Sequence, residues 1–166
     1  MKESLPYIEA LNSQTGLGIE LSSSGAVRLD LDGRGILLQW LDNLQEFVVY
    51  AEVGPLCGWR DGEVLKQLMS ANFLFMQTQG GALSYDPAAN MVGLNYTIPV
   101  YGLLPEDFVK RLDVIVTLAA EWRERLHRMS AEQERLATRS SLSEGAVSSA
   151  EREQNSFADM QNMMKV

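Results

Sequence analysis

Hydrophobic residues recur along this chain with two spacings, and these spacings mark its helices and strands. Spacings of three and four predict helices over residues 4–15, 61–76 and 105–128. Alternation of apolar and polar residues predicts three strands before the second helix and a β-hairpin after it, with Asp32-Gly33 as the first turn. The expected fold is α+β in the order α-β-β-β-α-β-β-α, with a three-strand antiparallel meander, a β-hairpin and a long C-terminal helix.

The second predicted helix, residues 61–76, has more apolar surface than one neighbour can cover. At ~100° per residue its apolar side chains spread over roughly 200°, about twice the stripe of an ordinary surface helix. We expect this helix to pack on its own sheet and also to meet a second copy of the chain; the alternative is a helix wrapped by its own fold. The interface of the expected homodimer is predicted at Leu65, Met69, Phe73, Met76, Leu83 and Tyr85.

The second and third predicted strands carry apolar residues on both faces. Leu37 and Leu41 in one strand, and Val48 and Tyr50 in the next, point away from the residues expected in the core. An antiparallel sheet usually has one face in water. The pattern therefore predicts either a second covering layer or an exposed apolar face.

The composition divides the chain into a domain of residues 1–129 and a tail of residues 130–166. The tail is rich in Ser, Glu, Gln, Ala and Arg. Such a segment buries too little surface to offset its ordering entropy, so we expect it to be mobile or partly helical. Phe157, Met160 and Met164 have helical spacing and form a stripe that can dock in a groove; the alternative is a frayed tail.

The charge balance and the cysteine content narrow the classes of partner and compartment. The chain has 22 acidic residues against 14 basic ones, a net charge of −8, which argues against a nucleic-acid partner. Its single cysteine excludes an intrachain disulfide. No apolar leader and no run of ~18 apolar residues is present, so we expect a soluble cytoplasmic protein without membrane insertion.

Few side chains point to catalysis, to a cofactor or to a metal. His127, the only histidine, lies among arginines at a predicted helix end, where a contact with the helix dipole is the simpler interpretation. Cys57 has no second cysteine or neighbouring histidine to activate it. Asp30 and Asp32 share a strand face without further acidic ligands, which favours a solvated face. We therefore expect a protein that is not an enzyme and holds no cofactor.

Seven segments carry a family resemblance: GLGIEL, LDLDGRGILLQW, EFVVYAEVGPL, LMSANFLF, GGALSYD, NMVGLNY and FVKRLDVIVTLAAEW. In this order they resemble the CesT-type (class I) chaperones of bacterial type III secretion, over roughly residues 5–128. The resemblance implies a homodimer of acidic α+β protomers in the bacterial cytoplasm. It implies binding of the N-terminal region of one or more secreted effectors, kept non-globular before export, with the second helix in the dimer contact. It also makes the secretion ATPase a candidate partner and says nothing about the tail.

The apolar strands agree with such a role. A sheet with apolar side chains on both faces can hold an extended partner by side-chain packing and, at a free edge, by strand addition. An export chaperone is the first hypothesis, and a non-enzymatic regulatory module acting on a folded partner is the second. The candidate partner surface is Tyr7, Leu11, Leu37, Leu41, Val48 and Tyr50, and the alternative is that these residues complete the core or the dimer.

Overall fold

A computed structural model describes residues 2–31, 33, 35–56 and 61–163, with side chains as far as Arg139 except that of Asp61. The helices are η1 (Lys2–Ser4, a 3-10 turn), α1 (Leu5–Thr15), α2 (Asp61–Ala71), η2 (Phe73–Phe75, a 3-10 turn) and α3 (Pro105–Met163). The strands are β1 (Ala26–Asp30), β2 (Gly35–Leu41), β3 (Glu46–Pro55), β4 (Ala82–Asp86) and β5 (Met91–Pro99). This order confirms the predicted α+β fold with its meander, hairpin and long C-terminal helix.

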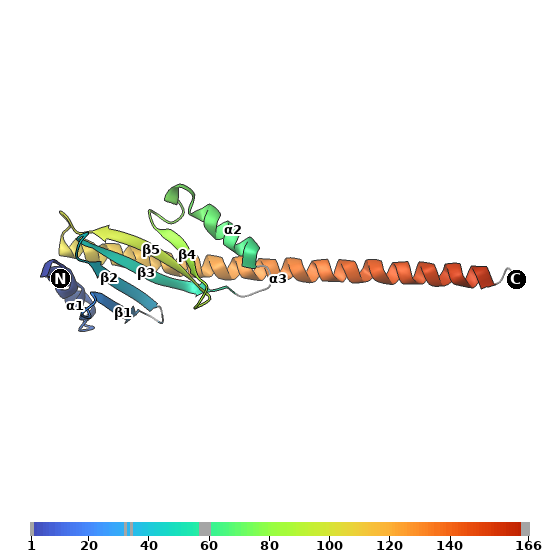
Figure 1. Cartoon of the computed structure of the whole chain (residues 1–166), viewed down its shortest axis with the longest axis horizontal. Coiled ribbons are helices and arrows are strands. Elements are labelled where there is room, and N and C mark those ends of the chain that lie inside the picture. Colours follow the sequence, from blue (N-terminus) through green and yellow to red (C-terminus); the bar gives the residue numbers. More distant parts are fainter. Residues whose placement is uncertain (1, 32, 34, 57–60, 164–166) are drawn as a thin grey trace.

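The five strands form one antiparallel sheet in the order β1-β2-β3-β5-β4. The chain leaves β3, passes through α2 to the outer strand β4, and returns as β5 between them. Figure 1 shows the sheet alongside the first part of α3, with α1 beside the start of α3 and α2 beyond β4. The two edge strands, β1 and β4, thus lie at opposite ends of the sheet.

The core lies between one face of the sheet and the helices α1 and α3. Tyr7 of α1 and Phe108 of α3 have ring centroids 5.4 Å apart, and Phe47 of β3 lies 4.7 Å from Phe108. Trp40 of β2 extends the cluster at 4.9 Å from Phe47. The Tyr7 hydroxyl donates to the carbonyl oxygens of Val100 and Leu103, at 3.1 Å and 3.0 Å. These contacts tie the N-terminal helix to the connection between β5 and α3.

The second helix is shorter than predicted. α2 ends at Ala71 instead of residue 76, because Leu74 and Phe75 have φ values of 56° and 55°, which an α-helix cannot contain. The Asn72 side chain fixes the turn: its Nδ2 donates to the Leu83 carbonyl at 2.9 Å, and the Leu83 N–H donates to Asn72 Oδ1 at 2.8 Å. The helix therefore ends just before Asn72, whose side chain is anchored to β4.

The last helix is much longer than the domain that it covers. Its inward side chains are buried from Phe108 to Leu126, and of the described side chains beyond Leu126 only Ala137 is buried. The backbone continues as one helix to Met163. The division at residue 129, with a mobile or partly helical tail behind it, stays a prediction. The side chains of the apolar stripe near the C-terminus lie outside the described residues. Over the described residues, none of the helices combines the length and apolar character needed to cross a membrane.

Candidate functional site

A run of exposed apolar side chains lies along the end of α2 and through η2, and we call it the α2–η2 ridge. Five of its side chains are mostly in solvent: Met69 (73% exposed), Phe73 (74%), Leu74 (68%), Phe75 (52%) and Met76 (78%). Together they expose on the order of 500 Å² of apolar surface, as much as the largest patch on a typical monomer. A patch of this size usually marks a surface that another molecule covers.

Buried polar groups hold the ridge in place from behind. Thr78 is fully buried, and its hydroxyl donates to the Gly81 carbonyl at 2.6 Å. The Tyr96 hydroxyl donates to the Thr78 carbonyl. The Gly80 N–H donates to the Phe75 carbonyl at 3.1 Å. The turn is therefore closed by its own hydrogen bonds and tied to β5 through Tyr96, and it presents its apolar side chains outward on a bonded backbone.

The residues predicted for the dimer interface take three kinds of position. Leu83 is buried and Leu65 is half-buried against the core, so both stabilise the protomer itself. Tyr85 is partly exposed and donates from its hydroxyl to Asn90 Oδ1 at 3.0 Å. Met69, Phe73 and Met76 are the predicted positions that lie on the ridge.

Leu74 and Phe75 also lie on the ridge, and the sequence did not assign them to it. On a continuous helix their directions would differ from those of Phe73 and Met76. Positive φ values turn them outward instead. The signal for this turn was the pair Gly80-Gly81, which shows that the chain leaves the helix but does not show where.

The face of the sheet opposite α1 and α3 is open, and its strip of apolar side chains crosses β2 and β3. The register places Leu37 opposite Tyr50. Val48 is flanked by Gln39 and Thr97 on the neighbouring strands. Leu37 is exposed, whereas Leu41, Val48 and Tyr50 are half-exposed. The predicted exposed apolar face is present in the protomer, since none of the described helices covers this strip.

Tyr50 is the central side chain of this open face. Its ring lies over Gly93 of β5, where a Cβ atom would collide with the ring. Burial raises the pKa of its hydroxyl above the ordinary value, and the nearby Glu52 carboxylate acts in the same direction. The phenol therefore stays neutral at physiological pH and offers both an apolar ring and a hydrogen-bond donor.

An ion pair borders the strip toward β1. Arg28 Nη2 lies 2.6 Å from Glu52 Oε1, and the Glu52 carboxylate occupies the space above Gly35 that a side chain on β2 would fill. The Arg28 side chain is mostly exposed, so the pair contributes little to stability. It gives the apolar strip a polar edge.

A second apolar surface lies beside β1, on the side of the sheet that faces α1 and α3. A groove of about 200 Å³ runs between α1, β1 and α3, and its apolar walls include Leu11, Leu29, Leu31 and Val116. Beyond Ala26, no described residue pairs with the backbone of β1 along this edge. The Gly25 carbonyl accepts the Trp40 N–H, and along an antiparallel pair of strands hydrogen-bonded residues alternate with residues that are not hydrogen-bonded to the partner strand. The N–H and C=O groups of Arg28 therefore point away from β2.

The two edges of the sheet differ in whether their outward backbone groups are already paired. At β4 the backbone of Leu83 is already paired with the Asn72 side chain, as described above. At β1 the loop before the strand covers only its first residue, through the Ser22 N–H that donates to the Ala26 carbonyl at 2.9 Å. A strand can therefore be added to β1 at Arg28 and Asp30.

Two predicted partner-surface residues belong to the core. Tyr7 and Leu11 are buried, Tyr7 through its aromatic contacts and its two hydrogen bonds, and Leu11 through packing at the base of the groove. A buried side chain is not available to a partner without rearrangement, so Tyr7 and Leu11 are not part of the open surface. The sequence could not decide this, because the burial of α1 depends on how α3 packs against it.

Groups with possible chemistry take structural or solvent-exposed positions. Asp30 Oδ1 accepts the Gly33 N–H at 2.8 Å, which is a turn contact. His127 is exposed on α3. Cys57 and Asp32 lie outside the described residues. Among the described residues, no three His, Cys, Asp or Glu side chains are grouped closely enough to hold a metal ion.

Comparison of the sequence with protein families shows which family has this fold and these surfaces in its matched region. The model of the Tir chaperone protein (CesT) family matches residues 7–123, which include both edge strands and the covering part of α3. No curated protein matches the chain.

Several solved structures share the fold. A chain of the ExsC–ExsE complex has a TM-score of 0.65 at 22% identity, over 75% of this chain and 92% of that chain. A chain of the HopA1–SchA chaperone–effector complex has a TM-score of 0.54 at 14% identity, over 75% and 98%. The complex of the Yersinia pestis type III secretion chaperone SycH with a stable fragment of YscM2 gives 0.55 at 17% identity, over 72% and 98%. At these identities the similarity establishes the fold.

Proposed function

Because the chain belongs to the Tir chaperone protein (CesT) family, we propose that it is a type III secretion chaperone. It binds the N-terminal region of a secreted effector as a homodimer and keeps that region non-globular until export. Binding of this kind needs surface and no catalytic group. Several structural relatives are complexes of a protein of this fold with a second chain, and one of them is a chaperone–effector complex.

The observation that carries this proposal is an open apolar face next to a free strand edge. An extended effector segment can pair with β1 at Arg28 and Asp30 and place alternate side chains in the groove beside Leu29 and Leu31. From there the chain can pass over the open strip and contact Val48 and Tyr50. A segment held in this way stays extended, because its backbone is paired with β1 and not with itself.

The homodimer is supported by the α2–η2 ridge. A disordered segment that folds onto a surface loses about 2–5 kcal/mol or more in ordering, so a large contact area is needed for useful affinity. Two protomers double the available face and edge. The ridge lies beyond β4, at the opposite end of the sheet from β1, so self-association leaves the proposed effector surface uncovered.

The direct test is binding of an exported protein's N-terminal segment. The first ~100 residues of an effector encoded beside this protein are expected to bind and to be protected from protease while remaining extended. Circular dichroism of the bound segment and the pattern of protected fragments report this. Protection of a folded partner alone would instead favour the regulatory module.

The proposed surface is tested by substitution on the open face. Val48→Asp and Tyr50→Asp are each expected to weaken effector binding by about 10-fold or more, because each buries a charge against the apolar segment. Gln67→Asp, on the exposed side of α2, is the matched control and leaves binding unchanged. Light scattering and thermal melting accompany each variant. If Val48→Asp and Tyr50→Asp lower the melting temperature as strongly as they lower affinity, these residues belong to the core instead.

A further inference from the structure

Exposed apolar side chains gather at the end of the sheet where β3 begins and β5 ends. Tyr101 is 99% exposed, Leu104 61% and Leu44 58%, and we call these three side chains the Tyr101 patch. Leu44 belongs to the turn between β2 and β3, and the other two belong to the connection between β5 and α3. Figure 1 shows this end of the sheet next to the start of α3, opposite the end at which α3 leaves the domain. The patch exposes on the order of 400 Å² of mainly apolar surface, as much as the largest patch on a typical monomer.

The two segments that carry the patch are bonded to each other. The Val100 N–H donates to the Gln45 carbonyl at 3.1 Å, which places Tyr101 close to Leu44. Gln45 has a φ of 54°, a conformation that a residue with a Cβ atom adopts at a cost in free energy. Because the bond joins the two segments directly, they keep one position relative to each other.

The turn that presents the tyrosine is also closed. It covers residues 100–103, and its Leu103 N–H donates to the Val100 carbonyl at 3.0 Å. Gly102 supplies the positive φ, 70°, at the third position of this turn. The Tyr7 hydroxyl holds the turn from α1 through the two hydrogen bonds described above. An aromatic side chain on a fixed backbone loses little freedom when a partner covers it, so Tyr101 has the properties of a binding anchor.

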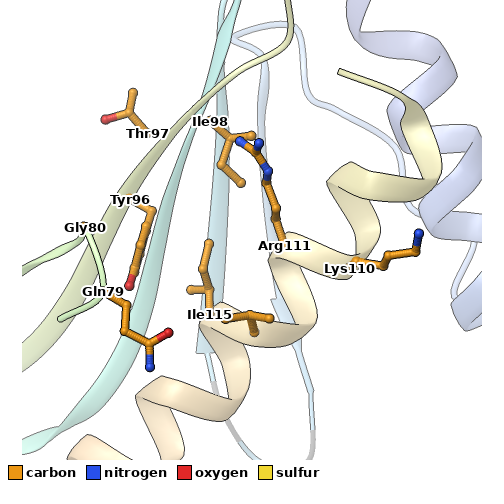
Figure 2. Close-up of a pocket in the computed structure, with 9 residues that line it drawn as sticks. Gln79, Gly80, Tyr96, Thr97, Ile98, Lys110, Arg111 and Ile115 are labelled. Atoms are coloured by element: carbon orange, nitrogen blue, oxygen red, sulfur yellow. The ribbon is translucent and has the colours of Figure 1, made fainter. Parts of the chain in front are cut away.

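The charged residues of the two segments have one sign. Those in residues 41–47 and 99–109 are all acidic: Asp42, Glu46, Glu106 and Asp107. The first basic residues of α3 leave this rim acidic. Lys110 pairs with Asp107 at 2.8 Å, and Arg111 lines the hollow between α3 and β5, beside Ile98 (Figure 2). An apolar patch with a carboxylate rim is complementary to a partner that combines apolar and basic side chains.

The backbone beneath the patch is largely paired, which limits the form of this partner. The N–H and the carbonyl of Val100 are both bonded, and the Leu104 carbonyl accepts the N–H groups of Asp107 and Phe108 at 3.0 Å each. These groups are not available for strand addition, so an extended segment would leave its own backbone unpaired here. A helix pairs its backbone internally and binds through its side chains. The patch therefore fits a helix.

We infer that the Tyr101 patch binds an amphipathic helix with Lys or Arg beside its apolar stripe, supplied by a protein other than the effector. This inference goes beyond the proposed function, because a helix at this end leaves the β1 edge at Arg28 and Asp30 free. Both residues pair with the part of β2 next to Gly35, at the far end of that strand from Leu44. The protein can then hold an effector and a second protein at the same time.

A pair of peptides tests the chemistry of the patch. The probes are a helix-forming peptide of Leu, Ala and Lys, with its leucines on one face, and a twin with Glu in place of every Lys. The Lys peptide is expected to bind the full-length chain, and the Glu peptide about 10-fold or more weakly, because the carboxylate rim repels it. Fluorescence anisotropy measures both dissociation constants. Equal affinities, or no binding of the Lys peptide, would contradict the inference.

Substitutions locate the bound peptide. Tyr101→Ala is expected to weaken the Lys peptide by about 10-fold or more, as loss of an aromatic anchor does, while the melting temperature stays unchanged because this side chain is almost fully exposed. Leu17→Ala, at another exposed leucine in a loop, is the matched control and should change binding less than about twofold. If Val48→Asp weakens the Lys peptide and Tyr101→Ala does not, the peptide lies on the open strip and the inference is overturned.

The same variant separates this partner from the effector and from a second copy. Tyr101→Ala is expected to leave binding of the effector segment and the mass in light scattering unchanged. Loss of effector binding would show that the patch belongs to the effector surface, and it would overturn the second partner while the proposed function stands. A smaller mass would show that the patch joins copies of this chain, which would also overturn it. Peptide binding at Tyr101 without binding of any effector segment would contradict the proposed function and support this inference.

Discussion

At the scale of single residues, the open face depends on a glycine that makes room for a tyrosine. Tyr50 lies across Gly93 on the neighbouring strand, and no larger residue leaves space for the ring in that position. Glycine in a central strand is otherwise unfavourable, because it loses backbone entropy and packs nothing. Here the Tyr50 ring fills the space above Gly93, which accounts for a glycine at this position of the strand.

Replacing this glycine is expected to move the ring and to destabilise the sheet. Gly93→Ala should lower the free energy of unfolding by about 1–3 kcal/mol, because the new methyl group overlaps the Tyr50 ring. In a Tyr50→Ala background the same change should cost little, so the two substitutions are non-additive. Urea denaturation of the four chains measures this coupling.

The control for this cycle is Gly62→Ala in α2. That position has open space around a Cβ atom, and alanine is expected to stabilise the helix by up to about 1 kcal/mol. If Gly93→Ala costs the same with and without the Tyr50 ring, then overlap with the ring is not the cause.

At the scale of elements, local patterns predicted what local interactions determine. The strands β2 and β3 were predicted because alternation is local, and the same alternation identified Leu37, Val48 and Tyr50 on the open face. The end of α2 was not predicted, because it depends on the bonds between Asn72 and Leu83, which are 11 residues apart in the sequence. The groove beside β1 was not predicted for the same reason, because it is formed by three elements that lie apart in the sequence.

The long helix α3 allows the predicted domain boundary to be tested by truncation. Ending the chain after Arg139 is expected to leave the melting temperature unchanged, and ending it after Met129 should lower stability by no more than about 1 kcal/mol. The reason is that Ala137 is the only buried side chain among those described beyond Leu126, and a methyl group contributes little. Differential scanning calorimetry of the three chains measures the difference. A fall of more than about 10 °C after Met129 would show that the segment behind it belongs to the folded domain.

At the scale of the whole molecule, the apolar surfaces lie on different sides of α3. The groove beside β1 is lined by Val109, Leu112 and Val116, whereas a hollow of about 450 Å³ between β5 and α3 is lined by Val114 and Ile115. The two surfaces therefore approach α3 from opposite edges of the sheet. On the proposed function, a second copy at the α2–η2 ridge and an effector at β1 can bind together, and the proposed homodimer would then present two free strand edges and two open faces to one partner chain.

The charge of the protomer gives the last prediction, which concerns the salt dependence of the dimer. Each protomer carries −8, so two protomers repel one another over a distance that shrinks from ~30 Å at 0.01 M salt to ~10 Å at 0.1 M. The α2–η2 ridge, which supports the proposed homodimer, consists of uncharged side chains. Salt therefore screens the repulsion between the protomers without weakening a contact made by this ridge. Raising NaCl from about 10 mM to about 300 mM should therefore lower the dimer dissociation constant several-fold in sedimentation equilibrium. Glu9→Gln with Glu20→Gln, both exposed and remote from the ridge, should reduce this dependence because two negative charges are removed per protomer. Weaker dimers at high salt would mean that ion pairs hold the interface, which the uncharged segment between Lys66 and Asp86 cannot supply.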